Sequence, residues 1–208
     1  MRCIICVTGK IAAGKNAVAA LLEQRGYRCV DADTLGHRAL IENESRIISE
    51  FADDARKKNI ALTDESGHLN RKALGALLFS DAALLKRHET IVYPSIERQI
   101  EAFILARPDE PIAINAAVLY KLPAILRRCA CIIYVDASPL RRLLRIRRRD
   151  ALPLPQIFRR FLAQRKLLLQ YAHTGIPLVR LKNNTNRQKL ARRLTEILRF
   201  YRLSGAEE

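Results

Sequence analysis

The chain of 208 residues is long enough for one full domain with its own core and short for two. Apolar residues make up 49% of it and charged residues 28%, a composition that excludes wholesale disorder. No apolar run approaches the roughly 18 residues that a membrane span needs, and the apolar start at Cys3–Val7 is shorter than the core of a signal peptide. We therefore expect a soluble, cytoplasmic protein with no membrane partner.

The positive charge of the chain is uneven. The net charge is +16, and residues 1–126 carry 17 basic and 16 acidic side chains, whereas residues 127–208 carry 20 and 5. Such an excess has two interpretations. The second half has an anionic partner, or the chain has a general preference for Arg, which outnumbers Lys 27 to 10.

Five short apolar runs, separated by helical patterns, predict buried strands at Cys3–Thr8, Tyr27–Val30, Pro111–Asn115, Cys131–Val135 and Pro177–Leu181. The helical patterns predict one helix from about residue 15 that stops at Gly26, one that restarts at Pro94, one at Pro139–Asp150 and one from Pro153 or Pro155 to about Tyr171. A last helix has one apolar face made of Leu190, Leu194, Ile197, Leu198 and Tyr201. Strands that alternate with helices predict an α/β fold with an open, mostly parallel sheet covered on both faces.

The five cysteines are an odd number and do not form a convincing metal or disulfide motif. Cys3 and Cys6 lie three apart in a strand, which places their side chains on opposite faces. Cys129 and Cys131 share a face, but no His or acid follows closely in sequence. We predict that all five, Cys29 included, are buried small apolar residues.

The segment from Gly9 to Lys15 fits G-x-x-x-x-G-K between a predicted strand and a predicted helix. In such a loop the glycines let backbone N–H groups surround phosphate oxygens, and the helix start and the lysine add positive charge. The next position, where a Ser or Thr hydroxyl commonly contacts Mg²⁺, is Asn16. An amide oxygen can also ligate a hard cation, so we predict a weak metal contact there.

Two carboxylates, Asp31 and Asp33, follow the second strand. Ligands of open parallel sheets bind beyond the carboxyl ends of the strands, so these acids are expected near the phosphate loop. A carboxylate there can accept the proton of an attacking hydroxyl. The alternative is that Asp33 caps a helix that begins at Thr34.

The ordered set of motifs resembles the dephospho-coenzyme A kinase family. After the phosphate loop come V-D-A-D at 30–33, G-x-L-N-R at 67–71, V-D-A-S-P at 135–139 and R-x-x-x-R-D at 145–150. The resemblance implies ATP-dependent phosphorylation of the ribose 3′-hydroxyl of dephospho-coenzyme A, the last step of coenzyme A synthesis, with ATP and Mg²⁺. It also implies a single P-loop kinase-like domain over 1–208, with a helical acceptor-binding region at 60–107 and an Arg-rich lid at 139–170.

The resemblance assigns roles to individual residues. Asp33 matches the general base, and with Arg71 and Gln164 it would contact the acceptor. Arg145 and Arg149, four apart on one helix, match arginines of the lid that bind ATP, with Arg145 also stabilising the transferring phosphoryl group. The residues that would bind the ATP phosphates are Gly9, Ala12, Ala13, Gly14, Lys15, Asn16 and Ala17, of which Lys15 is also catalytic.

This chain departs from the family pattern at several positions. A run resembling D-x-P-L-L-x-E reads here as Asn115 to Lys121, without the proline or either acid. Arg142 stands where Gln is common, Tyr93 replaces a His before Pro94, and His37 replaces an Arg. These departures concern the acceptor more than ATP.

Two further functions stay open from the sequence. One is a P-loop kinase for another nucleoside or small hydroxyl acceptor. The other is a nucleotide-dependent nucleic-acid-binding protein that uses the basic C-terminal half. The chain has no Trp and 6% aromatic residues, so it offers few platforms on which bases stack, which disfavours nucleic acid as a partner. We expect a monomer or a weak homo-oligomer.

Overall fold

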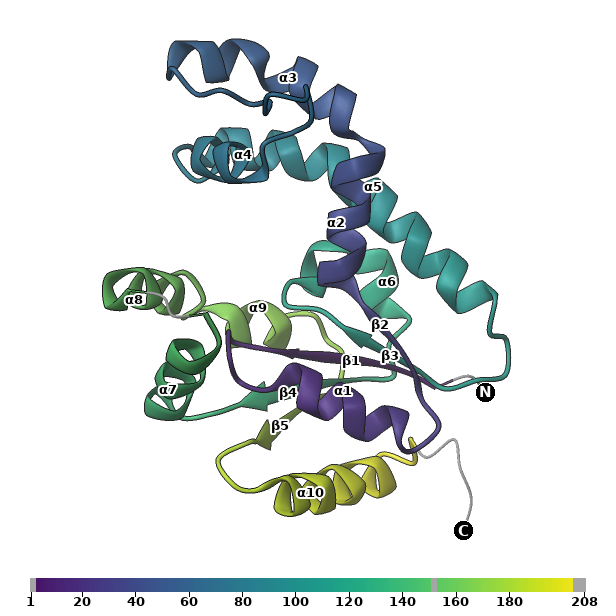
Figure 1. Cartoon of the computed structure of the whole chain (residues 1–208). Helices are drawn as coiled ribbons and strands as arrows, with labels where there is room; N and C mark the ends of the chain where they lie inside the picture. Colours follow the sequence, from purple (N-terminus) through teal and green to yellow (C-terminus); the bar gives the residue numbers. More distant parts are fainter. Residues whose placement is uncertain (1–2, 151–152, 204–208) are drawn as a thin grey trace. The chain divides into compact units, whose positions relative to one another are not determined.

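The computed structural model describes residues 3–150 and 153–203. The chain divides into two compact units. One comprises Met1–Asp33 together with Glu101–Glu208, and the other comprises Thr34–Ile100. The first contains the sheet and the phosphate loop, and the second is helical (Figure 1).

The sheet of the first unit has five parallel strands in the order β2-β3-β1-β4-β5. They are β1 (Ile4–Gly9), β2 (Arg28–Asp31), β3 (Ile112–Asn115), β4 (Cys131–Asp136) and β5 (Leu178–Lys182). All six residues of the central strand β1 are buried, as expected of a strand covered on both faces. The predicted strands and the parallel α/β sheet are thus confirmed, with boundaries shifted by a residue.

Helices cover both faces of this sheet (Figure 1). On one face, α1 (Lys15–Glu23) and α10 (Arg187–Phe200) pack together and against the strands. The other face carries α6 (Pro123–Arg127) and α9 (Leu167–Ala172). The buried residues of α10 are the predicted Leu190, Leu194 and Leu198, while Ile197 and Tyr201 are partly buried.

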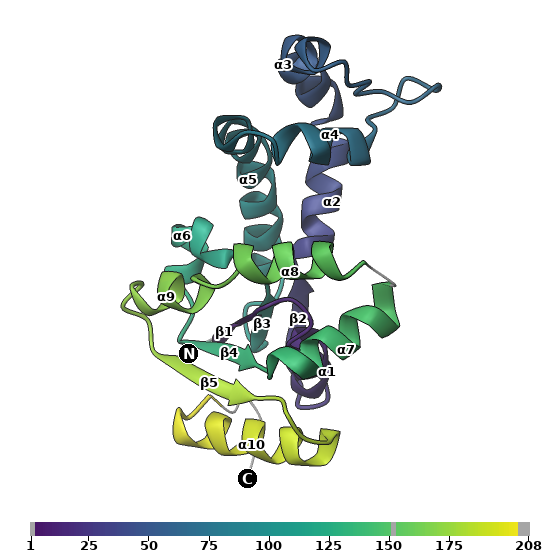
Figure 2. The same ribbon diagram turned by 90° about the vertical axis from the view of Figure 1, so that its left-hand side faces the viewer.

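Beyond the carboxyl end of β4 the chain forms α7 (Pro139–Asp150) and α8 (Leu154–Ala163) (Figure 2). The predicted helix from Pro153 to about Tyr171 is wrong in one respect. It is two helices, because α8 ends at Ala163 and α9 begins at Leu167. Gln164 is the C-cap of α8, and its side chain is engaged elsewhere, as described below.

The second unit contains most of α2 (Ala32–Glu42) and α5 (Ala82–Leu105), with α3 (Glu44–Lys57) and α4 (Arg71–Leu78). Pro94 does not restart a helix but lies inside α5, so that prediction is wrong. A proline in a helix interior removes one backbone hydrogen bond, and the flanking buried residues Ile91, Val92 and Ile96 keep the helix packed. Arg87 of α5 binds Glu50 and Asp54 of α3 at 2.7 and 2.9 Å.

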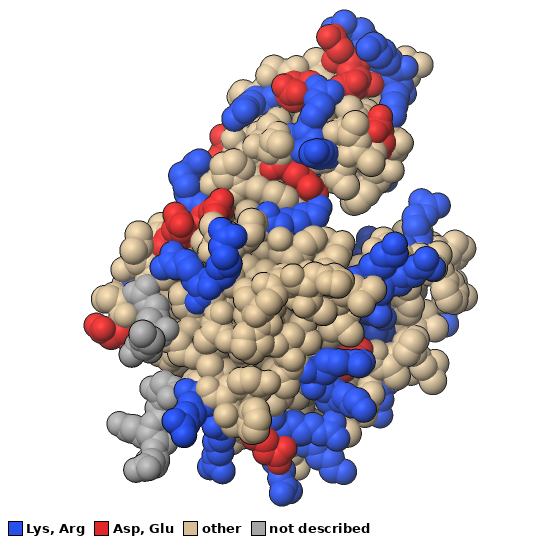
Figure 3. All heavy atoms as spheres, turned by 180° about the vertical axis from the view of Figure 1, so that it is seen from behind, with Lys and Arg blue, Asp and Glu red and all other residues tan. Residues whose placement is uncertain are grey.

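The structure also shows where the cysteines and the surface charges lie. All five cysteines are free thiols. Cys6, Cys129 and Cys131 are buried as predicted, whereas Cys3 and Cys29 are partly exposed, so the prediction of burial is wrong for these two. On the face seen in Figure 3, most of the charged side chains on the first unit are basic, whereas basic and acidic side chains mix on the second. No helix within the described residues is long and apolar enough to cross a membrane.

Candidate phosphate-binding site

The loop between β1 and α1 has a backbone that requires glycine at two positions. Gly9 has a φ of +152° and Gly14 a φ of +103°, values that side-chain-bearing residues rarely adopt. A Cβ on Gly9 would collide with the Val135 carbonyl oxygen, and one on Gly14 would collide with Asn183 Nδ2. The loop therefore lies tightly against β4 and the segment after β5.

The start of α1 gives this loop the backbone arrangement that suits an anion. Helix α1 begins at Lys15, and the first N–H groups of a helix have no partner within it. A cavity of about 300 Å³ opens over this helix end. It is lined by Ala12, Gly14, Lys15, Asn16, Arg145 and Arg149, so N–H groups, one lysine and two arginines converge on the same space.

Lys15 is poised between charges of both signs. Burial lowers the pKa of its ammonium group below the ordinary lysine value, and the nearby Arg149 lowers it further. The carboxylates of Asp33 and Asp31 act in the opposite direction and raise that pKa. The amino group and both acids therefore belong to one electrostatic site.

The two acids have different structural duties. Asp31 is the last residue of β2, and its Oδ1 accepts a hydrogen bond from the Asp33 N–H at 2.9 Å. Asp31 therefore caps α2, which begins at Ala32, and the alternative that Asp33 caps a helix from Thr34 is wrong. The Asp33 side chain is exposed in the first turn of α2, and its charge is close enough to Lys15 to raise the pKa of that lysine.

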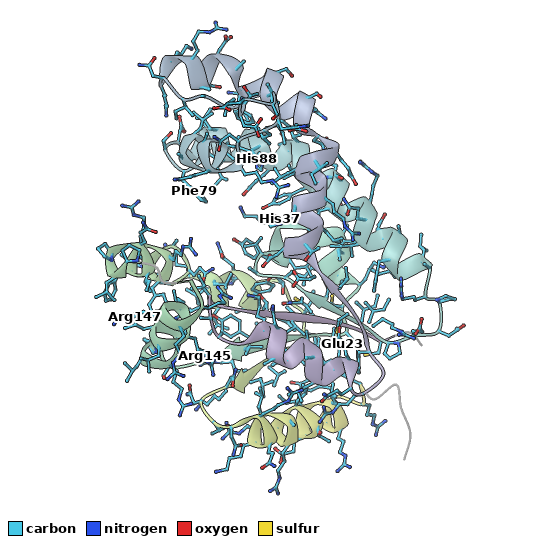
Figure 4. The ribbon with its side chains drawn as sticks, in the orientation of Figure 1. Glu23, His37, Phe79, His88, Arg145 and Arg147 are labelled. Carbon is cyan, nitrogen blue, oxygen red and sulfur yellow. The ribbon has the colours of Figure 1, made fainter. Side chains whose placement is uncertain are left out.

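Arg145 ties the Arg-rich helix to the phosphate loop (Figure 4). Its guanidinium donates to the carbonyls of Ala12 and Ala13 at 3.1 and 3.0 Å, and to that of Asn183 at 3.1 Å. Asn183 Nδ2 also donates to the Ala13 carbonyl at 2.8 Å. These bonds join α7 and the segment after β5 to the backbone of the loop.

Ile11, in the same loop, is held at both of its backbone groups. Its N–H donates to Gln164 Oε1 at 2.6 Å, and its carbonyl accepts from Arg142 Nε at 2.9 Å. The Arg142 guanidinium lies 4.0 Å from the centre of the Phe161 ring and is buried, and this burial lowers its pKa. Residues of α7 and α8 thus fix the loop from outside.

The structure brings most of the predicted ATP-binding residues to one place. Ala13 is buried beneath the loop, and Ala17 is exposed in the first turn of α1. Arg71 belongs to the second unit. There it lines a cavity of about 230 Å³ with Glu44, His68 and three apolar residues, Leu40, Ile41 and Leu69. Gln164, predicted to contact the acceptor, accepts a hydrogen bond from the loop N–H of Ile11, and its contact with an acceptor stays a prediction.

Three residues of this site received no role from the sequence, namely Arg142, Asn183 and Asn115. Asn115 Nδ2 donates to Asn16 Oδ1 at 3.1 Å and to Asp31 Oδ2 at 3.0 Å. Arg142 and Asn115 stand out in the sequence as departures from the family pattern. Their partners lie far away in sequence, so no local pattern identifies them.

Substitution of Arg142 tests whether its hydrogen bond to Ile11 stabilises the phosphate loop. We expect Arg142→Gln to lower the free energy of unfolding by about 1–3 kcal/mol, because it removes a charged hydrogen bond and the stacking on Phe161. Arg141→Gln, one residue away and exposed, should change it by less than about 0.5 kcal/mol. Denaturant titration of both variants measures the difference. Equal stability of the two would show that Arg142 does not support the loop.

Comparisons with known proteins agree on one family. The family model for dephospho-CoA kinase matches residues 3–188. A dephospho-CoA kinase from Treponema denticola is 34% identical over 197 residues, which cover 93% of this chain and 87% of that protein. One from Geobacter sulfurreducens is 33% identical over 198 residues, covering 93% and 96%.

Solved structures agree with this fold. The crystal structure of TT1252 from Thermus thermophilus superposes with a TM-score of 0.76 at 28% identity, covering 96% of this chain and 97% of that one. A dephospho-CoA kinase from Campylobacter jejuni shares the fold with a TM-score of 0.61 at 20% identity. Because the family model covers nearly the whole chain, including the phosphate loop, Asp33 and the Arg-rich helix, this protein belongs to the dephospho-CoA kinase family.

Proposed function

We propose that this protein transfers the terminal phosphoryl group of ATP to the ribose 3′-hydroxyl of dephospho-coenzyme A, giving coenzyme A and ADP. The observation that carries this proposal is the match of the family model over residues 3–188. The phosphate cavity with Lys15 and the neighbouring carboxylates supports it, since phosphoryl transfer depends mostly on positioning and on charge stabilisation.

In the proposed reaction, the ribose 3′-oxygen forms a bond to the γ-phosphorus, and the bond from that phosphorus to the β,γ-bridging oxygen breaks. Asp33 accepts the hydroxyl proton, and the leaving group is ADP. Lys15 and the first N–H groups of α1 hold the phosphates. Arg149, at the cavity wall, and Arg145 compensate the negative charge that develops during transfer.

We propose that Mg²⁺ accompanies ATP. Bound Mg²⁺ would neutralise phosphate charge and polarise the transferring group. The donors beside the loop fit this ion in type, because Asn16 Oδ1 and Asp31 Oδ2 are hard oxygen atoms. Both oxygen atoms already accept a hydrogen bond from the side-chain amide of Asn115. A cation that binds these two oxygen atoms would therefore compete with that amide.

For the acceptor, we propose that the helical region 60–107 contacts dephospho-coenzyme A through Arg71 and the cavity that it lines, to which residues 40, 41 and 44 also contribute. The segment 139–170 is proposed to act as the lid. Its exposed arginines include Arg141, Arg147 and Arg148. Gln164, through its bond to Ile11, is proposed to couple this segment to the loop. We expect a monomer or weak homo-oligomer that acts in the cytoplasm on small molecules.

The proposed reaction is tested by incubating the protein with ATP, Mg²⁺ and dephospho-coenzyme A and detecting coenzyme A by mass. We expect coenzyme A from the wild type. For Lys15→Ala we expect kcat/KM to be at least 100-fold lower, which corresponds to a loss of about 3 kcal/mol of transition-state stabilisation, as expected for one stabilising group. Lys10→Ala is the matched control. Lys10 lies in the same loop but is not among the residues that line the cavity.

Parallel reactions with other nucleosides and small alcohols distinguish the alternative acceptors. Coenzyme A formation that does not depend on Lys15 would contradict the proposed site. ATP consumption with another acceptor, and none with dephospho-coenzyme A, would keep the kinase chemistry and overturn the substrate. A steep salt-dependent affinity for DNA or RNA at physiological salt would favour the nucleic-acid alternative.

A further inference from the structure

Asn115 contacts both Asn16, at the phosphate cavity, and the Asp31 carboxylate. It is the last residue of β3, and in the register of the sheet it lies beside Val7 of β1 and Asp31 of β2. Its side chain is 5% exposed. The residue therefore sits between the strand that leads into the phosphate loop and the strand that ends at the two carboxylates.

The side-chain amide of Asn115 has an orientation fixed by its neighbours. Nδ2 donates both of its hydrogens, to Asn16 Oδ1 at 3.1 Å and to Asp31 Oδ2 at 3.0 Å. The reversed amide would place an oxygen against the Asp31 carboxylate. Oδ1 of Asn115 is buried and accepts no hydrogen bond from the described residues, so the NH₂ end alone determines the position of this group.

The NH₂ group of Asn115 bridges two hard oxygen atoms, Asn16 Oδ1 beside the loop and Oδ2 of the Asp31 carboxylate. A divalent cation bridges such oxygen atoms when a site is built from carboxylates and hydroxyls. A hydrogen-bond donor does the same without a metal, because its partial positive charge faces both oxygens. Asn16 and Asn115, both departures from the family pattern, are thus one interacting pair in this chain.

We propose that Asn115 is a positioning residue that holds Asn16 and Asp31 together in place of a protein-bound cation. The divalent cation of the reaction then arrives with ATP and has no preformed site on the free protein. This inference depends on the proposed kinase function only in assuming that the protein binds ATP.

The decisive variant is Asn115→Asp, which replaces the NH₂ donor with a third oxygen facing Asn16 Oδ1 and the Asp31 carboxylate. We expect the Tm of this variant to rise by about 3 °C or more with about 10 mM Mg²⁺ in the absence of nucleotide. The wild type should gain less than about 1 °C. Without Mg²⁺, the variant should bind ATP about tenfold more weakly than the wild type, and Mg²⁺ should restore that affinity.

Asn186→Asp is the matched control. It makes the same chemical change at the N-cap of α10, where Asp caps as well as Asn, and it lies outside the phosphate cavity. This variant should respond to Mg²⁺ like the wild type. The double variant Asn16→Thr with Asn115→Asp, which introduces a hydroxyl beside the carboxylate, should bind Mg²⁺ at least as well as Asn115→Asp alone.

A measurement on the wild type keeps the proposal testable if Asn115→Asp does not fold. Mn²⁺ binding, followed by electron paramagnetic resonance, should show no site with a Kd below about 1 mM in the free protein and one site once ATP is added. Tight Mn²⁺ binding without ATP would overturn the proposal. An Asn115→Asp protein whose Tm does not change with Mg²⁺ would also overturn it. None of these readouts uses an acceptor, so failure of the proposed substrate would not affect them.

Discussion

Asp33→Asn is expected to lower kcat for coenzyme A formation by about 10²–10⁴-fold while leaving the Kd for ATP within about threefold. The amide cannot accept the proton of the attacking hydroxyl, but it keeps the size of the side chain in the first turn of α2. Because Asp33 is exposed and Asp31 makes the capping bond, the substitution should not disturb the helix. Single-turnover kinetics and calorimetric titration with ATP separate the two quantities.

Asp31→Asn is the matched control for this substitution. It removes the same charge near Lys15, and asparagine caps a helix as well as aspartate. At saturating Mg²⁺, used because Asp31 Oδ2 is also a proposed Mg²⁺ donor, its kcat should fall less than that of Asp33→Asn. If Asp31→Asn lost as much activity as Asp33→Asn, the general base would be assigned to Asp31, or the effect would come from the lower pKa of Lys15 that both neutralisations produce.

Gly14→Ala is expected to weaken ATP binding by about 30- to 700-fold, which corresponds to about 2–4 kcal/mol. Two costs combine. The φ of +103° is strained for alanine, and the new Cβ would overlap Asn183 Nδ2. The loop must move, and with it the first turn of α1 and the Lys15 ammonium group. Calorimetric titration of ATP gives the change in Kd.

Gly75→Ala provides the comparison. Gly75 lies inside α4, and a Cβ there meets nothing within 4 Å. Alanine should therefore stabilise the protein by about 0.5–1 kcal/mol and leave ATP binding unchanged. A double variant of Gly14→Ala with Asn183→Ala should recover part of the lost affinity, because the overlap is removed and the strain in φ stays. Full ATP affinity in Gly14→Ala alone would show that the loop conformation described here is not the binding conformation.

Local signals were sufficient for the elements around the phosphate loop. The apolar run before Gly9, the two glycines and Lys15 define a strand, a turn and a helix within some twenty residues, and each depends on neighbours in sequence. Gly26 ends the first helix with a φ of +83°, as predicted, for the same reason. The β strands were found because strands buried on both faces are continuous apolar runs.

Predictions that depended on a single local rule were less secure. Proline is a good first residue of a helix, but Pro94 lies within α5, whose apolar residues pack on both sides of it. The helical pattern from Pro153 to Tyr171 is continuous in sequence and broken in the structure between Ala163 and Leu167. At Pro94, the packing of the surrounding helix outweighed the preference of one residue.

The sequence by itself determined the parallel α/β sheet, the phosphate loop and the family resemblance, because these depend on short runs of adjacent residues. Only the tertiary structure shows which distant side chains support that loop. Arg142 and Gln164 reach Ile11 across more than a hundred residues, and Asn115 joins Asn16 to Asp31 from another strand. The contacts of Asn115 depend on the strand order β2-β3-β1-β4-β5, which brings β3 between β1 and β2, and a spacing along the chain contains no record of that order.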